Sequence, residues 1–319
     1  MWEALGIPTP VWVTIHNAWS PATLRQYMVP ARKWEQYTKD IGINPVEPTP
    51  LQVLNFLQDM VDKGLGYGTI NTAKSFLSAF ISLEGIQLGL HPLITRFMKG
   101  VYRQATPKSK YTDTWDPIPV LHTLSGWGHT EDICLERLTK RTIVLFLLAT
   151  GQRLQAVHKL KRTDIIWGQN SCKITYSERL KTNDPKTKPL ILRFHKREED
   201  TLCVYTHLRT YVDNVDTQAA APYVFSTMKD PTHRASSDTI SRWVRESLEE
   251  GGVSNSYKPY STRHAATSAA HRAKVPLPEI LSSAGWTGDS SFARFYNRPL
   301  AEDNPDQYET DFLPALLQG

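Results

Sequence analysis

Apolar residues recur at helical spacing through the first 110 residues, and this pattern predicts a small bundle of four helices. The predicted helices begin at Ser20-Pro21, Thr49-Pro50, Gly66-Tyr67-Gly68-Thr69 and His91-Pro92, where hydroxyl, glycine and proline residues provide typical start signals. Pro30 is expected to kink or split the first helix. The second helix is expected to bury Leu51, Leu54, Leu57, Met60 and Val61.

The second part of the chain combines helices with the period-two pattern of a small sheet. Leu135–Ala149 is apolar on most faces, which is typical of a helix at the centre of a domain. Cys172–Ser177 and Pro189–Phe194 flank a polar loop and predict two antiparallel strands. Further helices are expected at residues 118–124, 153–160, 204–215, 238–250, 262–273, 277–284 and 290–296. The predicted fold class is therefore mainly α with a small antiparallel β-sheet, in which a helical domain precedes an α+β domain.

Residues 105–117 are rich in proline, small polar residues and lysine, which is typical of a linker between domains. This linker divides the chain into expected domains of residues 1–110 and 111–319. Basic residues gather beside it, namely Lys99, Arg103, Lys108 and Lys110. Two interpretations of these residues stand about equal: a solvated basic linker, or a strap that contacts phosphates.

Composition excludes several classes of protein. The longest uninterrupted apolar run, Ile143–Ala149, is far shorter than the roughly 18 residues that a membrane-spanning helix needs. The three cysteines, Cys134, Cys172 and Cys203, lie far apart and form neither a disulfide framework nor a metal motif, so a reducing intracellular compartment is expected. Motifs for nucleotide triphosphates, nicotinamide cofactors and the common zinc sites are absent from the sequence. The net charge of +5 is compatible with a polyanionic partner but weak as a signal.

A set of basic and aromatic residues is spread over the second domain in a recognisable order. Arg153 ends the segment Thr150-Gly151-Gln152-Arg153, Lys181 lies in the loop between the predicted strands, and Tyr260-Ser261-Thr262-Arg263-His264 follows much later. Trp286 comes after Ala284-Gly285, and Tyr296 closes the series. This order resembles the tyrosine recombinases, also called the phage-integrase family. The resemblance covers roughly residues 117–300, and the helical first domain is similar to the family's core-binding domain. The Thr-Gly-Gln-Arg and Ala-Gly-Trp segments resemble those of the recombinases of eukaryotic mobile elements of the DIRS and Ngaro kind.

The resemblance implies a site-specific recombinase that cuts and rejoins DNA through a 3′-phosphotyrosine, with no metal, nucleotide or other cofactor. Tyr296 would be the nucleophile, and Arg153 and Arg263 would bind the nonbridging phosphate oxygens. Lys181 would protonate the leaving 5′-oxygen and is preferred over Lys186 and Lys188 of the same loop. Tyr260 would hydrogen-bond to the phosphate or help with proton transfer, and Trp286 would donate to a phosphate oxygen or pack to hold Tyr296 in place. His264 is expected to be structural, with phosphate contact as the alternative.

The resemblance also implies partners and a location. The two domains would close on double-stranded DNA as a clamp, and the working unit would be a tetramer on DNA that is a monomer or dimer when free, with no membrane association. The location would be nuclear if the source is a eukaryotic mobile element, and cytoplasmic otherwise. The apolar segment Phe312–Leu317 would fold onto its own domain or dock onto a neighbouring protomer.

Three departures from the family pattern keep other functions open. Ala156 occupies the usual acidic position three residues after the first arginine, and Tyr260 replaces the commoner histidine. The spacing from Trp286 to Tyr296 is one residue longer than usual, with Phe295 at the usual position. One alternative is a domesticated or inactive recombinase that only binds DNA, and another is a monomeric enzyme that relaxes supercoiled DNA in the manner of a type IB topoisomerase.

Overall fold

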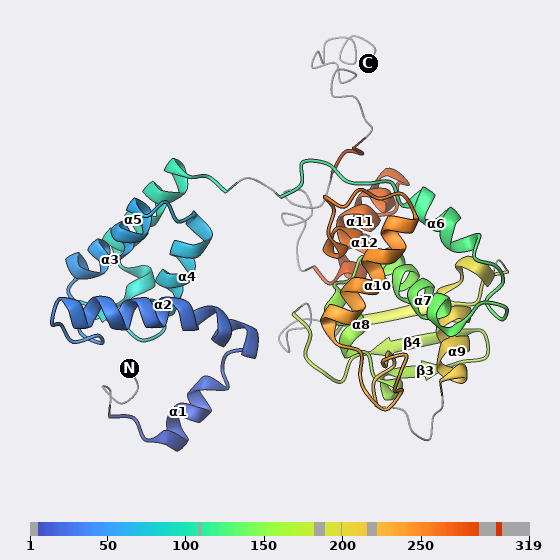
Figure 1. The fold of residues 1–319 in the computed structure, drawn as a ribbon, viewed down its shortest axis with the longest axis horizontal. Helices are drawn as coiled ribbons and strands as arrows, with labels where there is room; N and C mark the ends of the chain where they lie inside the picture. The colour runs from blue at the N-terminus through green and yellow to red at the C-terminus, as the bar shows by residue number, and fades with distance from the viewer. Residues whose placement is uncertain are drawn as a thin grey trace, which may run out of the picture. The chain divides into compact units, whose positions relative to one another are not determined.

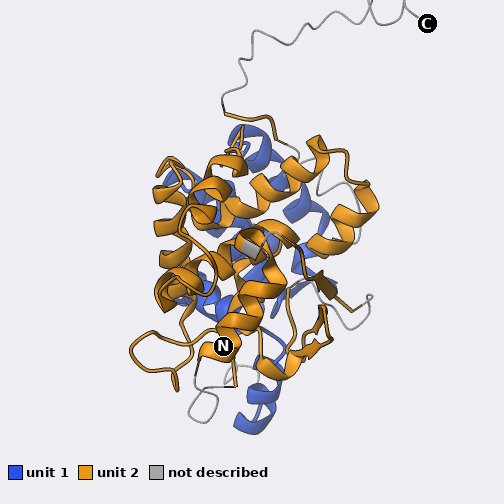
Figure 2. Cartoon of the chain, turned by 90° about the vertical axis from the view of Figure 1, so that its right-hand side faces the viewer, with its two compact units in different colours: residues 1–109 blue, residues 110–319 orange. Residues whose placement is uncertain are grey.

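The computed structural model describes residues 6–107, 110–181, 189–198, 200–215, 222–286 and 298–301. Internal contacts divide the chain into two compact units, residues 1–109 and 110–319, so the division falls one residue from the expected boundary (Figure 2). Each unit has its own hydrophobic core. Within the described ranges, no helix combines the length and the apolar character that crossing a bilayer requires.

The first unit contains the four predicted helices and a further one. The helices are α1 (Thr9–His16), α2 (Pro21–Asp40), α3 (Pro50–Asp62), α4 (Tyr67–Ser78) and α5 (Pro92–Gln104) (Figure 1). Between α4 and α5 lie a two-stranded hairpin, β1 (Ser82–Leu83) and β2 (Ile86–Gln87), and the 3-10 turn η2 (Leu88–Leu90). The sequence pattern did not predict α1 or the hairpin. The start signals are confirmed, because the Ser20 hydroxyl accepts from the Thr23 amide and Thr49 forms a capping box with Gln52.

Two expectations about this unit are wrong in detail. Pro30 does not split α2, which runs unbroken through it and buries the proline, so the expected split is wrong and the kink stays a prediction. Leu51, expected in the buried stripe of α3, is 66% exposed. The buried positions of α3 are Val53, Phe56, Leu57 and Met60. These residues follow the i, i+3, i+4, i+7 spacing of one helix face, and Leu51 lies off that face.

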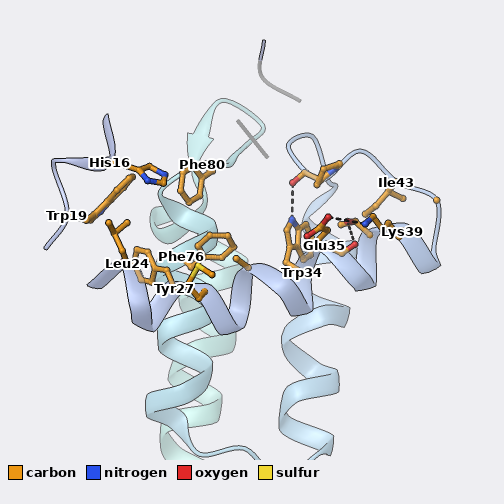
Figure 3. Close-up of a pocket in the computed structure, with 15 residues that line it drawn as sticks. His16, Trp19, Leu24, Tyr27, Trp34, Glu35, Lys39, Ile43, Phe76 and Phe80 are labelled. Carbon is orange, nitrogen blue, oxygen red and sulfur yellow. Dashed lines mark hydrogen bonds and ion pairs between the residues drawn. The ribbon is translucent and has the colours of Figure 1, made fainter. Parts of the chain in front are cut away.

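The first unit also holds an apolar cavity of about 650 Å³ along α2 (Figure 3). Its lining is mostly aromatic and aliphatic and includes Trp19, Tyr27, Phe76 and Phe80. The ammonium of Lys39, which also lines it, is paired with Glu35 at 2.9 Å. Because phosphate binding depends on available cationic donors, this cavity lacks the character of a phosphoryl-transfer site.

The second unit begins with α6 (Pro117–Ser125) and α7 (Leu135–Thr150), and α7 is buried on most of its faces as its composition predicts. After α8 (Leu154–Lys159) and the turn η3 (Arg162–Asp164), the chain enters a three-stranded antiparallel sheet in the order β3-β4-β5. The strands are β3 (Ile165–Trp167), β4 (Ser171–Thr175) and β5 (Ile191–His195). The pairing of β4 with β5, in which Cys172 lies opposite Phe194, confirms the predicted hairpin. The sequence reading missed β3, which is short.

The remaining elements complete a mainly helical second unit. They are the turn η4 (Asp200–Leu202), α9 (Val204–Asn214), α10 (Ser237–Glu250), the turn η5 (Pro259–Ser261), α11 (Thr262–Arg272) and α12 (Leu277–Ala284). In Figure 1, α11 and α12 lie beside one another, and α7 contacts α9, α10 and α11. The expected helix at residues 290–296 lies outside the described residues. The predicted fold class is confirmed: the chain is mostly helical, with small antiparallel sheets.

Candidate functional site

The side chain of Arg263 joins the ends of two helices that are far apart in the sequence. Arg263 lies in the first turn of α11 and is 0% exposed. Its Nη1 donates to the carbonyl oxygen of Gly151 at 2.7 Å and to that of Ala284 at 3.0 Å. These carbonyls stand at the carboxyl ends of α7 and α12, where helix carbonyls lack partners within the helix. One guanidinium therefore binds the segments that lead into Arg153 and Trp286.

Both helices end with a glycine in the left-handed conformation. Gly151 has φ +61° after α7, and Gly285 has φ +70° after α12. This conformation turns the chain away from the helix axis, and residues with a Cβ adopt it at a cost. Trp286 follows directly, and its ring centroid lies 4.1 Å from the Arg263 Cζ, a distance typical of a cation–π contact. The Ser283 hydroxyl also donates to the Thr150 carbonyl oxygen, at 3.0 Å.

Arg153 is the N-cap residue of α8 and is half-buried. Its Nη1 is buried and has no hydrogen-bond partner among the residues that the structure describes. Leaving a buried donor unpaired costs about 1–3 kcal/mol, and more when the donor is charged. Such a group is suited to bind an anion that arrives from outside the chain.

Tyr260 and His264 lie on the same side of the junction between η5 and α11. Tyr260 is 39% exposed, and its ring centroid is 5.7 Å from that of the buried His264. Tyr111 contacts His264 in the same way, at 5.8 Å. Tyr260 is therefore the exposed member of this aromatic cluster, and His264 is its buried member.

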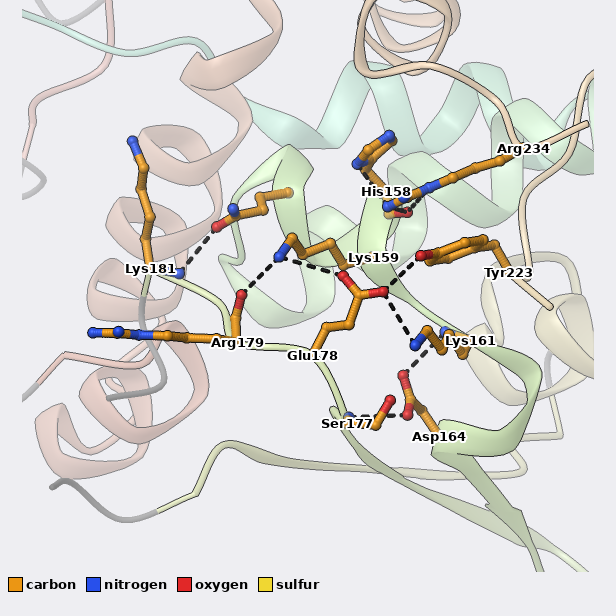
Figure 4. Close-up of polar contacts among 11 residues, drawn as sticks. His158, Lys159, Lys161, Asp164, Ser177, Glu178, Arg179, Lys181, Tyr223 and Arg234 are labelled. Carbon is orange, nitrogen blue, oxygen red and sulfur yellow. Dashed lines mark hydrogen bonds and ion pairs between the residues drawn. The ribbon is translucent and has the colours of Figure 1, made fainter. Parts of the chain in front are cut away.

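Lys181 lies at the end of the chain segment that follows β4 (Figure 4). Its backbone N–H donates to Oε1 of Gln155 at 3.0 Å, so the segment is attached to α8 two residues after Arg153. The Lys181 side chain is exposed. Lys186 and Lys188, the alternative loop lysines, lie outside the described residues, as do Tyr296 and Lys108.

The remaining basic residues expected to bind DNA are exposed. Lys99 and Arg103 are on α5 of the first unit. Lys110 is at the start of the second unit, where its Nζ lies 5.4 Å from the ring centroid of Tyr111. Exposure of these three side chains is compatible with both sequence interpretations, the solvated linker and the phosphate-contacting strap.

The sequence reading missed a polar cluster at the base of the hairpin, drawn in Figure 4. The Glu178 carboxylate accepts from the Tyr223 hydroxyl at 2.6 Å and pairs with the ammonium groups of Lys161 at 3.1 Å and Lys159 at 3.4 Å. The hydrogen bond from Tyr223, together with those from the two lysines, lowers the pKa of Glu178 to about 2. No motif marks this cluster, because its members come from three separate segments.

A histidine and an arginine extend the same cluster. The Arg234 Cζ lies 3.6 Å from the ring centroid of Tyr223, and its Nε donates to the His158 carbonyl oxygen at 2.9 Å. Burial, with the nearby charges of Arg234 and Lys159, lowers the pKa of His158. His158 is therefore held neutral at the carboxyl end of α8.

Comparisons with known proteins relate the second unit to a protein family and the chain to solved structures of the same fold. The family model described as "Phage integrase family" matches residues 130–302, which is more than half of the chain. Among solved structures, an integrase of the transposon Tn1549 in complex with transposon right end DNA is 17% identical, with a TM-score of 0.60, covering 97% of this chain and 96% of that one. A lambda integrase dimer bound to a COC′ core site is 14% identical, with a TM-score of 0.56, covering 98% of this chain and 99% of that one.

A third similar structure is the XerH site-specific recombinase bound to a palindromic difH substrate, in a post-cleavage complex. It is 13% identical, with a TM-score of 0.59, and covers 85% of this chain and 75% of that one. At these identities the structural matches establish the fold alone. No curated protein matches the sequence. The family match over the second unit shows that the chain belongs to the phage integrase family, whose members are the tyrosine recombinases.

Proposed function

We propose that this protein is a DNA strand-transfer enzyme, a site-specific recombinase or integrase that acts through a 3′-phosphotyrosine intermediate. The observation that carries the proposal is the contact of Arg263 with both Gly151 and Ala284, which brings three separated sequence segments to one place. The buried, unpartnered Nη1 of Arg153, within the described ranges, adds a cationic donor suited to an external anion. The DNA-bound states named for the lambda, Tn1549 and XerH proteins support DNA as the partner.

The chemistry assigns one role to each group. The Tyr296 oxygen attacks the phosphorus, the bond from phosphorus to the 5′-oxygen breaks, and Lys181 gives a proton to that leaving oxygen. The phenol proton passes to solvent or to a nearby base. Rejoining reverses these steps, because the phosphotyrosine keeps the energy of the phosphodiester bond. No metal or nucleotide enters the scheme.

The two arginines stabilise the charge that develops on the nonbridging oxygens. A planar guanidinium binds two such oxygens at once, and removing one preorganised donor of this kind typically reduces the rate by about 10²- to 10³-fold. The orientation of the Arg263 guanidinium is fixed by the hydrogen bonds from its Nη1 to two carbonyl oxygens and by its contact with the Trp286 ring. Since Arg263 is fully buried, a phosphate can reach it only if the groups that cover it shift when DNA binds. Tyr260, which is accessible, would donate to the phosphate beside it.

A suicide substrate tests the proposal. This is a duplex with a nick near the cleavage position, so that the short 5′-hydroxyl fragment diffuses away and the covalent complex accumulates. Because the target sequence is unknown, a nicked-duplex library is incubated with protein, and covalent complexes are isolated under denaturing conditions and sequenced. We expect covalent attachment by the wild-type protein and none by Tyr296→Phe. Equal attachment by Tyr296→Phe, or no attachment by the wild type to any duplex, would refute the assignment.

The suicide duplexes separate the proposal from one alternative, and a supercoiled plasmid separates it from the other. An inactive DNA-binding relative would retain duplexes without covalent attachment. A topoisomerase of type IB would relax any supercoiled plasmid as a monomer, whereas a recombinase requires its sites to pair. We further propose a mobile element of the DIRS or Ngaro kind as the source, with a nuclear location, and a tetramer on DNA. Support for the source rests on the segments Thr150–Arg153 and Ala284–Trp286.

A further inference from the structure

The polar cluster at the base of the β4–β5 hairpin contacts the segment that links β4 to Lys181, at the carboxyl end of α8. Arg153 caps the amino-terminal end of α8, and Lys181 follows the hairpin strand β4. The cluster of Glu178, Lys159, Lys161 and Tyr223 has no role in the reaction as described so far. The role inferred for this cluster rests on the proposed function, since it concerns the delivery of the proton by Lys181.

Residues 178–181 are attached to α8 at both ends. At the carboxyl end of α8, Lys159 pairs with the Glu178 carboxylate at 3.4 Å and donates to the Arg179 carbonyl oxygen at 2.9 Å. In the first turn of α8, Gln155 accepts from the Lys181 N–H at 3.0 Å. The segment therefore runs antiparallel to α8 and delivers Lys181 to the end of the helix that Arg153 caps.

Glu178 is itself held against a rigid partner. Tyr223, which donates to it at 2.6 Å, lies beside the chain that follows α8, because the Val224 amide donates to the Leu160 carbonyl at 2.8 Å and the Arg162 amide donates to the Pro222 carbonyl at 3.0 Å. The guanidinium of Arg234 also stacks on the Tyr223 ring, with its Cζ 3.6 Å from the ring centroid. Figure 4 shows the Lys181 side chain extending away from this cluster. Glu178 lies at the opposite end of residues 178–181, which is called the inner end here because it contacts the cluster.

A carboxylate is required here for electrostatic reasons. Lys159 and Lys161 both direct their ammonium groups to the same place, and without an anion between them they would repel one another. Glu178 neutralises this pair, and its low pKa keeps it ionised at any neutral pH. The acidic position that the family places three residues after Arg153 is the buried Ala156, so α8 supplies no carboxylate of its own at that point.

We propose that Glu178 is a positioning residue that holds the Lys181 segment along α8 and thereby sets the Lys181 ammonium at the leaving 5′-oxygen. Glu178 does not touch the DNA or the reacting atoms. It acts through Lys159 and the 178–181 backbone. Loss of its charge removes one attachment of the inner end of the segment, and Lys181 then spends less time in a geometry that allows proton transfer.

The test compares two leaving groups. A 5′-alkoxide is the conjugate base of an acid about as weak as water, so it needs a proton as it leaves. A 5′-bridging phosphorothiolate releases a thiolate, whose conjugate acid has a pKa of about 8.5, and needs none. Covalent attachment rates are measured with the full-length protein on matched suicide duplexes that carry oxygen or sulfur at this one position.

We expect Lys181→Ala to slow attachment to the oxygen substrate by about 10²-fold or more, the usual contribution of a general acid. Glu178→Gln keeps the shape of the side chain and removes its charge, and it should slow attachment to the oxygen substrate by about 10-fold. Tyr223→Phe should slow this attachment by a smaller factor. Both losses are smaller than that of Lys181→Ala because the general acid is displaced rather than removed. All three should return to within about twofold of the wild type on the sulfur substrate. Glu178→Gln should add no further loss in a Lys181→Ala background, because coupled residues are not additive.

Asp213→Asn is the matched control. It removes a carboxylate from an exposed pair with Arg209 on α9, and it should leave both rates unchanged. The inference is overturned if Glu178→Gln attaches to the oxygen substrate at the wild-type rate or slows attachment to both substrates equally. It is also overturned if the rate loss of Glu178→Gln adds to that of Lys181→Ala in the double variant, or if the sulfur substrate fails to rescue Lys181→Ala. If the wild type attaches to neither substrate, the proposed function falls and the inference falls with it.

Discussion

Gly151→Ala tests the physical basis of the junction at Arg263. Gly151 has φ +61°, and a Cβ built on it would lie 2.7 Å from the Cγ2 of Thr267. Ordinary carbon–carbon contacts are about 3.5–4.0 Å, so the new methyl overlaps its neighbour by roughly 1 Å. Thr267 is buried one turn along α11 from Arg263, where it cannot easily move aside.

The magnitude follows from two costs and one gain. A residue with a Cβ in the left-handed conformation costs about 1–2 kcal/mol. Overpacking of a close-packed core costs about 1–3 kcal/mol. Replacing glycine stiffens the unfolded chain and returns about 0.4–1 kcal/mol. We therefore expect Gly151→Ala to lower the free energy of unfolding of the second unit by about 1–5 kcal/mol, from the combination of these ranges.

Two further variants separate strain from overlap in equilibrium urea unfolding of the full-length protein. Gly252 has φ +80° in the same unit, with nothing within 4 Å of its Cβ position, so Gly252→Ala reports the backbone strain alone. Thr267→Ser removes the clashing methyl and keeps the hydroxyl that donates to the Arg263 carbonyl at 2.8 Å. We expect Gly151→Ala to cost about 1–3 kcal/mol more than Gly252→Ala, and Thr267→Ser to recover that difference in the double variant. Equal costs for the two glycine variants would refute the reasoning.

Three other outcomes follow from buried groups. Trp34→Ala, at a fully buried position of the first unit, should destabilise that unit by about 3–5 kcal/mol in urea unfolding, and a loss below about 1 kcal/mol would contradict the packing. Arg141→Met should cost about 2–4 kcal/mol, because two backbone carbonyls each lose the charged donor Arg141 Nη1; an unchanged unfolding midpoint would contradict this. The lowered pKa of Glu178 means that its contribution to stability is complete above its ordinary value of 4.5 and is lost as the pH falls toward about 2. The difference in unfolding midpoint between wild type and Glu178→Gln should therefore be larger at pH 6 than at pH 2.5, and a constant difference would exclude the linkage.

Local chemistry made much of the secondary structure predictable. The start signals at Ser20 and Thr49 work because a hydroxyl satisfies an amide that the first turn leaves unpaired, and this depends only on neighbouring residues. The hairpin of β4 and β5 was predictable for the same reason, since its two strands are close in sequence. The errors came where tertiary packing decided the outcome. Leu51 has the right residue type for the core but the wrong angle around α3.

The candidate site was predictable only as an ordered set of residue types. Arg153, Arg263 and Trp286 could be named from their segments, but nothing in their spacing showed that the Arg263 guanidinium would be buried against two helix ends. Glu178 could not be named at all, because a glutamate after a strand is ordinarily a solvated surface residue. Its partners come from α8 and from residues 222–236, and only the folded chain assembles them.

The sequence by itself determined most of the described helices, the β4–β5 hairpin, the basic balance and the identity of the chemical groups, because hydrogen-bonded turns and apolar periodicity act between residues a few positions apart. Tertiary structure alone decided which groups meet. Arg263 and Gly151 are brought together across more than a hundred residues by the packing of α11 against α7, and Lys181 is brought to the Arg153 end of α8 by side chains from distant segments. Contacts of this kind depend on how whole elements bury their apolar faces, and no local pattern records that arrangement.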